Sequence, residues 1–475
     1  MTRHPFRSAP PRKLFGTDGI RGKAGRYPLD SDTVEKLGGV VVGILKSGAG
    51  PLRILIGRDT RESGKDLEAA LCDGIFRAGG CPVRGGILPT PAIAYLTAAG
   101  SFQAGIMISA SHNSYEDNGI KIFSREGYKL EDRLEAEIEA GILLERQVTP
   151  GHQELQGQSA GEEMRQRYLS FLLKIAPKQV DYKKIRIAID CANGAASRIA
   201  PLLFSSLGME IHSISTQPSG RNINEECGSV HPDKVQRLTR KVGADLGVAL
   251  DGDADRAIFA APTGEILDGD HVLFLTALSW KRRNLLKGNA IVSTVMANQW
   301  LENSLAREGI EIHRTDVGDR NVLTRMRDLG CNLGGEPSGH IIFHDHSSTG
   351  DGLLTTLMFL EAVHDLGIDL ADWTRSVRKY PQRLVNIDVT CQPSLREHPE
   401  IGPAIGAAEE RLSGSGRILV RYSGTEPKVR IMVEAESSDL LEKIINQISP
   451  LLRKHLSISN DPAPKRRDDP PKEAR

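Results

Sequence analysis

The sequence lacks an excess of charge of either sign and contains few aromatic residues. Its 475 residues include 61 Lys and Arg against 61 Asp and Glu, while Phe, Trp and Tyr make up 5%. A long nucleic-acid footprint or a polybasic membrane anchor would shift this balance toward positive charge. We therefore expect neither nucleic acid nor a membrane among the partners of this protein.

Long apolar runs and paired cysteines are also missing. The longest apolar stretch contains Val40–Leu45, far short of the roughly 20 residues that a membrane-spanning helix needs. The segment 1–13 is polar, basic and rich in proline, so we expect no secretory signal there. The six cysteines are scattered without a CxxC pair, which is typical of reduced thiols in a large cytosolic protein. Hydrophobic residues at 39% suffice for several packed cores, so we expect a soluble, multi-domain, cytoplasmic enzyme.

Three segments repeat one pattern: a β-branched apolar run, a polar loop, a helical period that glycine ends, and another short strand. The apolar runs are Arg53–Ile56, Ile185–Ile189 and Ala290–Thr294, and the helical periods cover 65–77, about 197–207 and 298–307. These features are typical of βαβ units. We therefore predict an α/β fold with three tandem, mixed α/β domains of related topology.

The pattern changes after Tyr380-Pro381. Residues 383–389 and 428–434 alternate, 417–422 have the composition of a strand, and 439–455 place apolar residues on one face of a helix. These segments predict a smaller α+β C-terminal domain. The predicted divisions are a disordered tail at 1–12, domains at 13–165, 166–265, 266–379 and 380–459, and a disordered tail at 460–475.

A Ser-His-Asn loop follows one of the apolar runs. Ser109–Asn113 comes directly after 106–108, and Lys121 lies on the next predicted strand. Because α/β proteins bind ligands at strand ends, Ser111 is a candidate acceptor of a phosphoryl group, with His112 and Lys121 beside it to handle charge. Taken alone, this motif is more often a capped turn.

An acidic turn follows the apolar run 246–250. Asp251, Asp253 and Asp255 alternate with small residues, and Arg256 comes next. Three carboxylates at this spacing repel one another unless a cation lies among them, and hard cations such as Mg²⁺ prefer oxygen ligands. A solvated acidic turn is the alternative. An EF-hand is excluded because Pro262 stands at the twelfth position, where that loop needs Glu.

Two further polar loops have the composition of sugar and phosphate sites. In the loop 334–340, Glu336 and Ser338 have the spacing to hold two neighbouring sugar hydroxyls, although an ordinary turn is equally consistent. In the loop 421–427, backbone donors and hydroxyls around Gly424 follow an arginine, and Arg430 comes shortly after. This composition favours a nest for a phosphate dianion, but not a Walker A loop, whose lysine and spacing are missing.

Together these loops resemble the α-D-phosphohexomutase family, most closely its phosphoglucosamine mutase branch, over residues 13–455. Phe15–Gly22 looks like the opening signature of that branch, and the four loops look like the phosphoserine, Mg²⁺, sugar and phosphate loops of the family. The stretches 190–195, 220–229, 317–320 and 349–352 are also similar. The sequence departs from the family pattern at Ser114, Ala254, Pro337 and Lys428, and none of these changes removes a charged or nucleophilic group.

The resemblance implies four domains around a central cleft, each lending one loop. Ser111, carried as phosphoserine, would give its phosphoryl group to glucosamine 6-phosphate and recover the other phosphate of the resulting 1,6-bisphosphate. The product would be glucosamine 1-phosphate, for UDP-N-acetylglucosamine synthesis. The implied cofactor is Mg²⁺, held by Asp251, Asp253, Asp255 and a phosphoserine oxygen of Ser111, and the implied activator is glucose or glucosamine 1,6-bisphosphate.

The resemblance also assigns roles to single residues. Arg21, Lys121 and Arg256 would surround the transferring phosphoryl group, and His112 would order the serine loop. Contacts to the substrate are implied for Glu336, Ser338, His340, Arg320, Arg421, Ser423, Gly424, Thr425 and Arg430. The fourth domain would close as a lid with a hinge near Tyr380-Pro381, and a homodimer is left open beside a monomer. This interpretation requires an accessible Ser111 hydroxyl close to the aspartates.

Three other functions fit parts of the pattern. A phosphomannomutase or phosphoglucomutase would use the same groups on a neutral hexose phosphate, but Phe15–Gly22 and the stretch 220–229 favour the hexosamine branch. A phosphatase would use the same serine but has little need of a lid. A silent sugar-phosphate-binding regulator is disfavoured because Ser111, the aspartates, Lys121 and Arg256 are all present.

Overall fold

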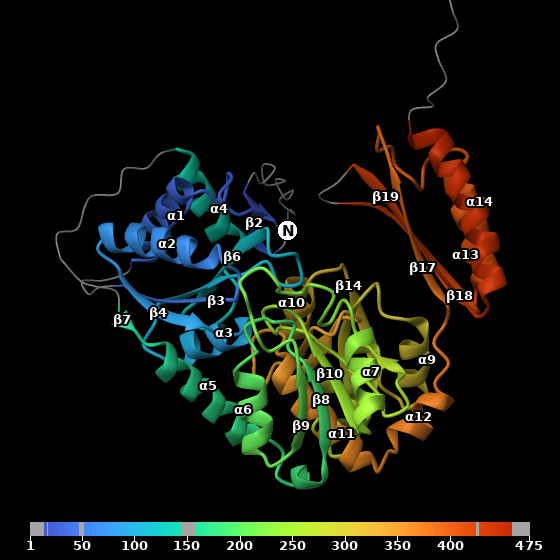
Figure 1. The fold of residues 1–475 in the computed structure, drawn as a ribbon. Helices are drawn as coiled ribbons and strands as arrows, with labels where there is room; N and C mark the ends of the chain where they lie inside the picture. Colours follow the sequence, from blue (N-terminus) through green and yellow to red (C-terminus); the bar gives the residue numbers. More distant parts are fainter. Residues whose placement is uncertain (1–13, 17, 47–51, 145–157, 424–426, 458–475) are drawn as a thin grey trace, which may run out of the picture. The chain divides into compact units, whose positions relative to one another are not determined.

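The computed structural model describes residues 14–16, 18–46, 52–144, 158–423 and 427–457 (Figure 1). The two tails predicted to be disordered lie outside these residues. The chain divides into two compact units. The first comprises Met1–Ala297 and Leu301–Val377, and the second comprises Asn298–Trp300 and Arg378–Arg475.

The first unit begins with a seven-stranded sheet in the order β1-β2-β6-β5-β3-β4-β7. Strands β3, β4, β5 and β7 run parallel to one another, whereas β1, β2 and β6 pair antiparallel, β6 with both β2 and β5. The strands are β1 (Phe15–Gly16), β2 (Gly19–Lys23), β3 (Arg53–Arg58), β4 (Cys81–Ile87), β5 (Ala104–Ile108), β6 (Asp117–Ser124) and β7 (Gln158–Ser159). The helices are α1 (Ser31–Leu45), α2 (Gly64–Arg77), α3 (Thr90–Ala99), α4 (Asp132–Leu143) and α5 (Gly161–Ile175).

The second sheet of this unit has five strands in the order β12-β11-β10-β8-β9, of which β8, β9 and β10 are parallel. Its elements are β8 (Arg186–Asp190), α6 (Ile199–Ser206), β9 (Glu210–Ile214), α7 (Asp233–Val242), β10 (Leu246–Leu250), β11 (Ala257–Ala260) and β12 (Ile266–Leu267), after the short helix η1 (Tyr182–Lys184). Helix α6 begins after the predicted position 197 because Ala192 and Asn193 first turn the backbone through the left-handed region, at φ of 54° and 48°.

The third sheet has four strands in the order β14-β13-β15-β16, again with parallel strands at its centre. Its elements are α8 (Gly269–Arg282), η2 (Lys287–Asn289), β13 (Ala290–Thr294), α9 (Gln299–Arg307), β14 (Glu311–Thr315), α10 (Asp319–Leu329), β15 (Leu333–Gly335), β16 (Ile341–Phe343), α11 (Gly352–Leu366) and α12 (Leu370–Ser376). The prediction of three mixed α/β domains of related topology is therefore confirmed.

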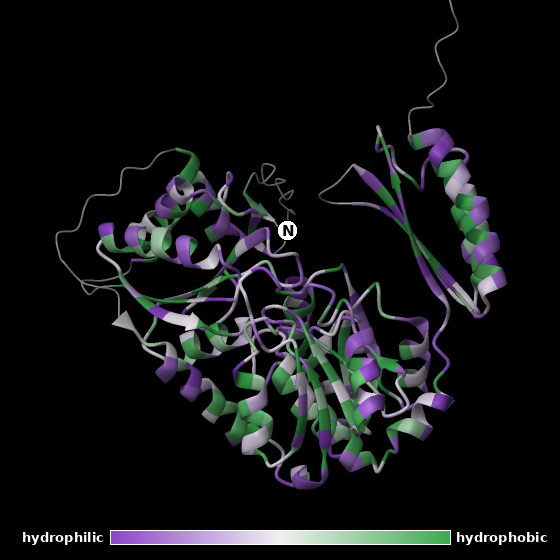
Figure 2. Cartoon of the chain, in the orientation of Figure 1, coloured by the Kyte–Doolittle hydropathy of each residue, from purple (hydrophilic) through white to green (hydrophobic). Residues whose placement is uncertain are grey.

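The second unit contains an antiparallel sheet in the order β17-β19-β18, which two helices cover. Its elements are β17 (Gln382–Asp388), α13 (Ile401–Leu412), β18 (Gly416–Tyr422), β19 (Lys428–Ala435) and α14 (Ser438–Leu456). Apolar residues gather on one face of α14 (Figure 2), where Ile444 and Ile448 are buried with Ile431 and Val433 of β19. The smaller α+β domain predicted at the C-terminal end is confirmed.

The structure also bears on membrane-spanning helices and on cysteine pairing. Within the described ranges, no helix combines the length and the apolar character that crossing a bilayer requires. The six cysteines all lie in described segments as free thiols, and only Cys391 is exposed.

A buried carboxyl group links α5 to the start of α11. Tyr168 Oη donates a hydrogen bond to Asp351 Oδ2 at 2.6 Å, and the N–H groups of Leu353 and Leu354 donate to Asp351 Oδ1 at 3.0 Å. Burial raises the pKa of Asp351 to about 6 despite these bonds. The folded protein therefore binds a proton at Asp351 more tightly than the unfolded chain does.

We expect Asp351→Asn to change how stability depends on pH. The stability that the raised pKa of Asp351 supplies is present below the pKa of the unfolded chain, about 4, and is lost as pH rises through about 6. Asparagine does not titrate, so the melting temperature of the variant relative to wild type should rise between pH 4 and pH 7. Thermal unfolding measures this, with Asp369→Asn at the exposed N-cap of α12 as the control. If the difference in melting temperature between Asp351→Asn and wild type is the same at pH 4 and pH 7, the raised pKa of Asp351 is contradicted.

Candidate active site

The serine loop begins where β5 ends, at the carboxyl edge of the parallel strands of the first sheet. Ser111 has a φ of 53°, in the left-handed region that a non-glycine residue adopts only when its surroundings impose it. Its hydroxyl donates a hydrogen bond to Asp251 Oδ2 at 2.7 Å, across 140 residues of sequence. The predicted nucleophile thus lies directly against the acidic turn of the second sheet.

Asp251, Asp253 and Asp255 lie close together in the turn that follows β10. Each offers one carboxylate oxygen, and these oxygens lie within 4.8 Å of one another. All three side chains are buried. Burial, with the charges of Asp255 and Asp253, raises the pKa of Asp251 well above its usual range. Burial also opposes ionisation of Asp255, but Lys121 and His340 outweigh it and hold the pKa of that carboxyl well below its usual range.

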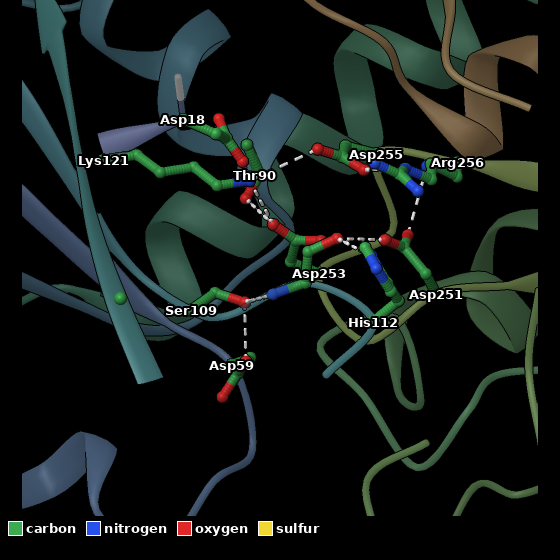
Figure 3. Close-up of polar contacts among 12 residues, drawn as sticks. Asp18, Asp59, Thr90, Ser109, His112, Lys121, Asp251, Asp253, Asp255 and Arg256 are labelled. Atoms are coloured by element: carbon green, nitrogen blue, oxygen red, sulfur yellow. Dashed lines mark hydrogen bonds and ion pairs between the residues drawn. The ribbon is translucent and has the colours of Figure 1, made fainter. Parts of the chain in front are cut away.

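The free oxygens of this cluster fit a divalent cation. Among the described residues, Asp253 Oδ1 and Asp255 Oδ1 are buried and receive no hydrogen bond. A buried carboxylate oxygen that accepts no hydrogen bond is costly, and Arg256 Nε, 3.7 Å from Asp255 Oδ1, is too far away to donate one. Mg²⁺ coordinates such oxygens readily. The second oxygen of Asp253 is already bound, because it accepts hydrogen bonds from Thr90 Oγ1 at 2.6 Å and Lys121 Nζ at 2.9 Å (Figure 3).

Lys121 is a fully buried cation on β6. Its Nζ lies 2.9 Å from Asp253 Oδ2, 3.4 Å from Asp255 Oδ2 and 3.3 Å from Asp18 Oδ2 (Figure 3). Burial opposes the charge, but these carboxylates outweigh it and raise the pKa of Lys121 well above its ordinary value. The ammonium group is therefore held in its charged form beside the cluster.

Two arginines and a histidine also surround Ser111. Arg21 on β2 pairs with Asp18, and Arg256 Nε lies 3.7 Å from Asp255 Oδ1. His112 Nδ1 lies 3.4 Å from Ser111 Oγ. Burial, together with the charges of Arg256 and Arg21, lowers the pKa of His112 to about 4. The imidazole is therefore neutral at neutral pH, and the positive charge comes from Lys121 and the arginines.

The predicted sugar loop follows β15 and adjoins the acidic turn. Glu336 Oε1 accepts a hydrogen bond from the Gly318 N–H at 3.1 Å, and Ser338 Oγ lies 3.5 Å from Glu336 Oε2. His340 is buried, with Nδ1 3.7 Å from Asp255 Oδ2. Its Nε2 accepts a hydrogen bond from the Gly350 N–H at 2.9 Å, which leaves the proton on Nδ1, toward Asp255. The second and third sheets therefore contribute adjacent loops to one site.

Arg320, predicted to contact the substrate, has its charge engaged elsewhere. Its Nη2 donates to Glu135 Oε1 at 2.6 Å, and it also pairs with Asp132. Both carboxylates belong to α4, so the guanidinium joins the third sheet's helix α10 to the first domain. Contact between Arg320 and a substrate stays a prediction.

The predicted phosphate loop lies in the second unit. Arg421 on β18 and Arg430 on β19 are directly opposite each other in the antiparallel pair. The N–H of Ser423 donates a hydrogen bond to the carbonyl oxygen of Lys428 at 2.8 Å. Like charges at facing positions repel each other, and a bound anion would relieve this repulsion. Gly424 and Thr425, also predicted to bind phosphate, lie outside the described residues.

The structure contradicts one requirement of the sequence interpretation. Ser111 is only 1% exposed, whereas an accessible hydroxyl was expected. The physical reason is local: the left-handed backbone at Ser111 directs the hydroxyl toward Asp251, and the loop packs against the second sheet. Substrate reaches this hydroxyl only after the groups that cover it move.

Several residues of the site were missed by the sequence analysis. Asp59 and Arg61 lie in the loop after β3, and both are fully buried next to the serine loop. That loop was recognised only as part of a βαβ unit, although the strand-end rule applied to the serine loop also covers it. Thr90 had no such signal, and Asn224 was covered only as part of the stretch 220–229. Their contacts to Asp253 and Ser111 depend on how two sheets pack.

Known proteins are similar to this chain over nearly its whole length. Family models of phosphoglucomutase/phosphomannomutase match 12–148 as α/β/α domain I, 166–264 as domain II, 268–380 as domain III and 384–451 as the C-terminal domain. A phosphoglucosamine mutase from Solibacter usitatus is 44% identical over 445 residues, which cover 94% of this chain and 99% of that protein. One from Thermus thermophilus is 45% identical over 442 residues, covering 93% and 98%.

Solved structures share the fold at lower identity. A phosphoglucomutase/phosphomannomutase family protein from Burkholderia thailandensis has a TM-score of 0.75 at 24% identity, covering 92% of this chain and 97% of that one. The Aspergillus fumigatus N-acetylphosphoglucosamine mutase, solved in complex with GlcNAc-6P and magnesium, has a TM-score of 0.62 at 18% identity, covering 94% and 96%. These likenesses concern the fold alone.

Proposed function

We propose that this chain, which belongs to the phosphoglucomutase/phosphomannomutase family and within it to the phosphoglucosamine mutases, interconverts glucosamine 6-phosphate and glucosamine 1-phosphate. The observation that supports this most directly is the Ser111 hydroxyl, which donates to Asp251 at 2.7 Å inside a cluster of three aspartates. A hydroxyl beside a cation site suits reversible storage of a phosphoryl group. The relatives named phosphoglucosamine mutase match 94% and 93% of this chain.

The reaction consists of two phosphoryl transfers through Ser111. In the first, the Oγ–P bond of phosphorylated Ser111 breaks and the phosphoryl group passes to O1 of glucosamine 6-phosphate. In the second, the P–O6 bond of the resulting 1,6-bisphosphate breaks and Ser111 Oγ regains a phosphoryl group. Phosphoryl transfer depends mainly on positioning and charge neutralisation. Mg²⁺ bound by Asp251, Asp253, Asp255 and a phosphoserine oxygen would neutralise charge on the group being transferred.

The remaining site residues divide into three groups in this proposal. Arg21, Lys121 and Arg256 neutralise the transferring group, and neutral His112 keeps the serine loop ordered. Glu336, Ser338 and His340 contact the sugar, with Arg320 beside them. The second unit supplies the clamp for the other phosphate through Arg421, Ser423, Gly424, Thr425 and Arg430, and it closes as a lid about a hinge near Tyr380-Pro381.

The proposal also covers the domain arrangement, the cellular location, the oligomeric state and the first phosphorylation of Ser111. Four domains, at 13–165, 166–265, 266–379 and 380–459, would each lend one loop to a central cleft, and the protein would act in the cytoplasm as a monomer or homodimer. Glucose or glucosamine 1,6-bisphosphate would load Ser111 for the first turnover. Because Ser111 is buried, binding of the substrate must move its neighbours, and His112, which is only partly exposed, is among them.

Comparing substrates tests which sugar the site prefers. We expect kcat/KM for glucosamine 6-phosphate to exceed that for glucose or mannose phosphates by at least about tenfold, which corresponds to about 1.4 kcal/mol. Coupled assays on the three sugar phosphates with the phosphorylated, Mg²⁺-loaded protein measure the ratio. Higher values on a neutral hexose would favour a phosphomannomutase or phosphoglucomutase. Release of free phosphate without an isomer would indicate a phosphatase, and binding without turnover a regulator.

A further inference from the structure

A buried arginine, Arg61, donates hydrogen bonds to the backbone of the serine loop. Arg61 Nη2 donates to the carbonyl oxygens of Ser111 at 3.0 Å and Asn113 at 2.8 Å. Arg61 Nη1 donates to the carbonyl of Asp117 at 2.9 Å and to that of Ser114. The side chain is completely buried, although an arginine is rarely buried unless its charge and donors are satisfied.

Asp59 fixes this arginine and reaches the serine loop by a second route. Asp59 Oδ2 accepts a hydrogen bond from Arg61 Nε at 2.9 Å. The same oxygen accepts one from Ser109 Oγ at 2.7 Å (Figure 3). Ser109 Oγ in turn accepts a hydrogen bond from the Ser111 N–H at 2.9 Å. One buried ion pair therefore controls both the N–H and the carbonyl of Ser111.

The hydrogen bonds leave Arg61 no capacity for a ligand. A guanidinium has five N–H donors, and here Nε donates to Asp59 while Nη1 and Nη2 each donate to two carbonyl oxygens. A phosphate or sugar would have to break one of these bonds to bind Arg61. The arginine therefore acts on Ser111 through the backbone and does not contact substrate.

The second sheet adds a matching clamp. Asn224 Nδ2 donates to the carbonyls of Ser111 and Asn113, both at 2.9 Å, so the Ser111 carbonyl is held from two domains. In the loop of Arg61 itself, Thr60 Oγ1 donates to Asn193 O at 2.6 Å. These bonds connect the serine loop to the domain that carries Asp251, the residue to which the Ser111 hydroxyl donates.

We propose that Arg61 is a positioning residue of the phosphoryl transfer and that, with Asp59, Ser109 and Asn224, it holds Ser111 in the left-handed conformation that directs its hydroxyl at the aspartate cluster. This inference rests on the proposed function of Ser111. Holding a non-glycine residue at a φ of 53° opposes its intrinsic preference, so the conformation requires the surrounding bonds. Lysine cannot replace Arg61, since its single ammonium cannot reach carbonyls and carboxylate in a planar fork.

The test compares Arg61→Lys and Ser109→Ala with wild type and with Arg58→Lys. Arg58 is the matched control because it lies beside Asp59 and its side chain bonds to Glu68 and to the backbone carbonyl of Asp59. Within the described part of the chain, that side chain donates no hydrogen bond to the serine loop or to the Asp59 carboxylate. Ser109→Ala removes the hydroxyl that accepts a hydrogen bond from the Ser111 N–H and donates one to Asp59. It leaves Arg61 in place, so this variant remains informative if Arg61→Lys does not fold. The measurements are kcat and KM per folded molecule, intact mass after incubation with glucose 1,6-bisphosphate, and melting temperature.

We expect kcat to fall about 100-fold in Arg61→Lys and about tenfold in Ser109→Ala, with KM within about threefold, because misplacing a reacting atom by about 1 Å has effects of this size. Phosphorylation of Ser111 by the bisphosphate should slow in the same order, and Arg58→Lys should keep wild-type kcat. A lower melting temperature with unchanged kcat in Ser109→Ala would overturn the proposal, and so would a rise in KM alone. Wild-type protein that never becomes phosphorylated at Ser111 would instead refute the proposed function.

Discussion

Replacing Ser111 by alanine is expected to remove mutase turnover, with a loss of more than about 10⁴-fold in kcat. The hydroxyl is the only protein group in the proposal that forms a bond to phosphorus, and it donates a hydrogen bond to Asp251 Oδ2 at 2.7 Å. Arginines, lysine and aspartates around it neutralise charge but do not replace the covalent step. A coupled assay on glucosamine 6-phosphate measures the loss.

Intact mass shows whether the loss has the proposed cause. After incubation with glucose 1,6-bisphosphate, wild type should gain one phosphate and Ser111→Ala none. Ser114→Ala is the matched control, because Ser114 is exposed three positions along the same loop and should keep wild-type turnover and mass gain. Near-native turnover of Ser111→Ala would contradict the phosphoserine assignment, and a phosphate gained by that variant would assign the modification to another residue.

Removing the metal or its ligands is expected to have the second largest effect. Chelation should reduce turnover of wild type by at least about 10³-fold, and added Mg²⁺ should restore it, because the charge on the transferring group would otherwise be left to Lys121 and the arginines. The combined variant Asp251→Asn, Asp253→Asn, Asp255→Asn should be inactive with or without Mg²⁺. This follows from the two buried oxygens of Asp253 and Asp255 that accept no hydrogen bond, which a cation would satisfy.

A readout independent of activity separates metal binding from loss of the fold. Mg²⁺ should raise the melting temperature of wild type, since a ligand that binds only the folded state stabilises it, and should leave that of the triple variant unchanged. The variant also strips Lys121 of two of its three carboxylate partners, so its own melting temperature should be lower. Asp233→Asn, on the exposed side of α7, is the control. Turnover of the triple variant without Mg²⁺ would eliminate the metal role.

Much of the fold follows from local sequence patterns. The apolar run predicted over 290–294 is β13, and the amphipathic period predicted over 439–455 lies within α14. Strand and helix periods are set by residues a few positions apart, so a single chain displays them directly. The same applies to Asp251, Asp253 and Asp255, which form one cluster because alternate residues in a single turn already lie close together.

The sequence by itself was insufficient to predict most long-range contacts. The sequence did determine that a serine loop, an acidic turn and a polar glycine loop each follow a strand, since that information is local. The family resemblance implied that Ser111 lies close to the aspartates, but only the tertiary structure showed the hydrogen bond from Ser111 to Asp251 across 140 residues. Only the tertiary structure decided that Arg61 holds the serine loop across 50 residues and that the serine is buried. These outcomes depend on how separate sheets pack and on which buried charges must find partners, and no local pattern carries that information.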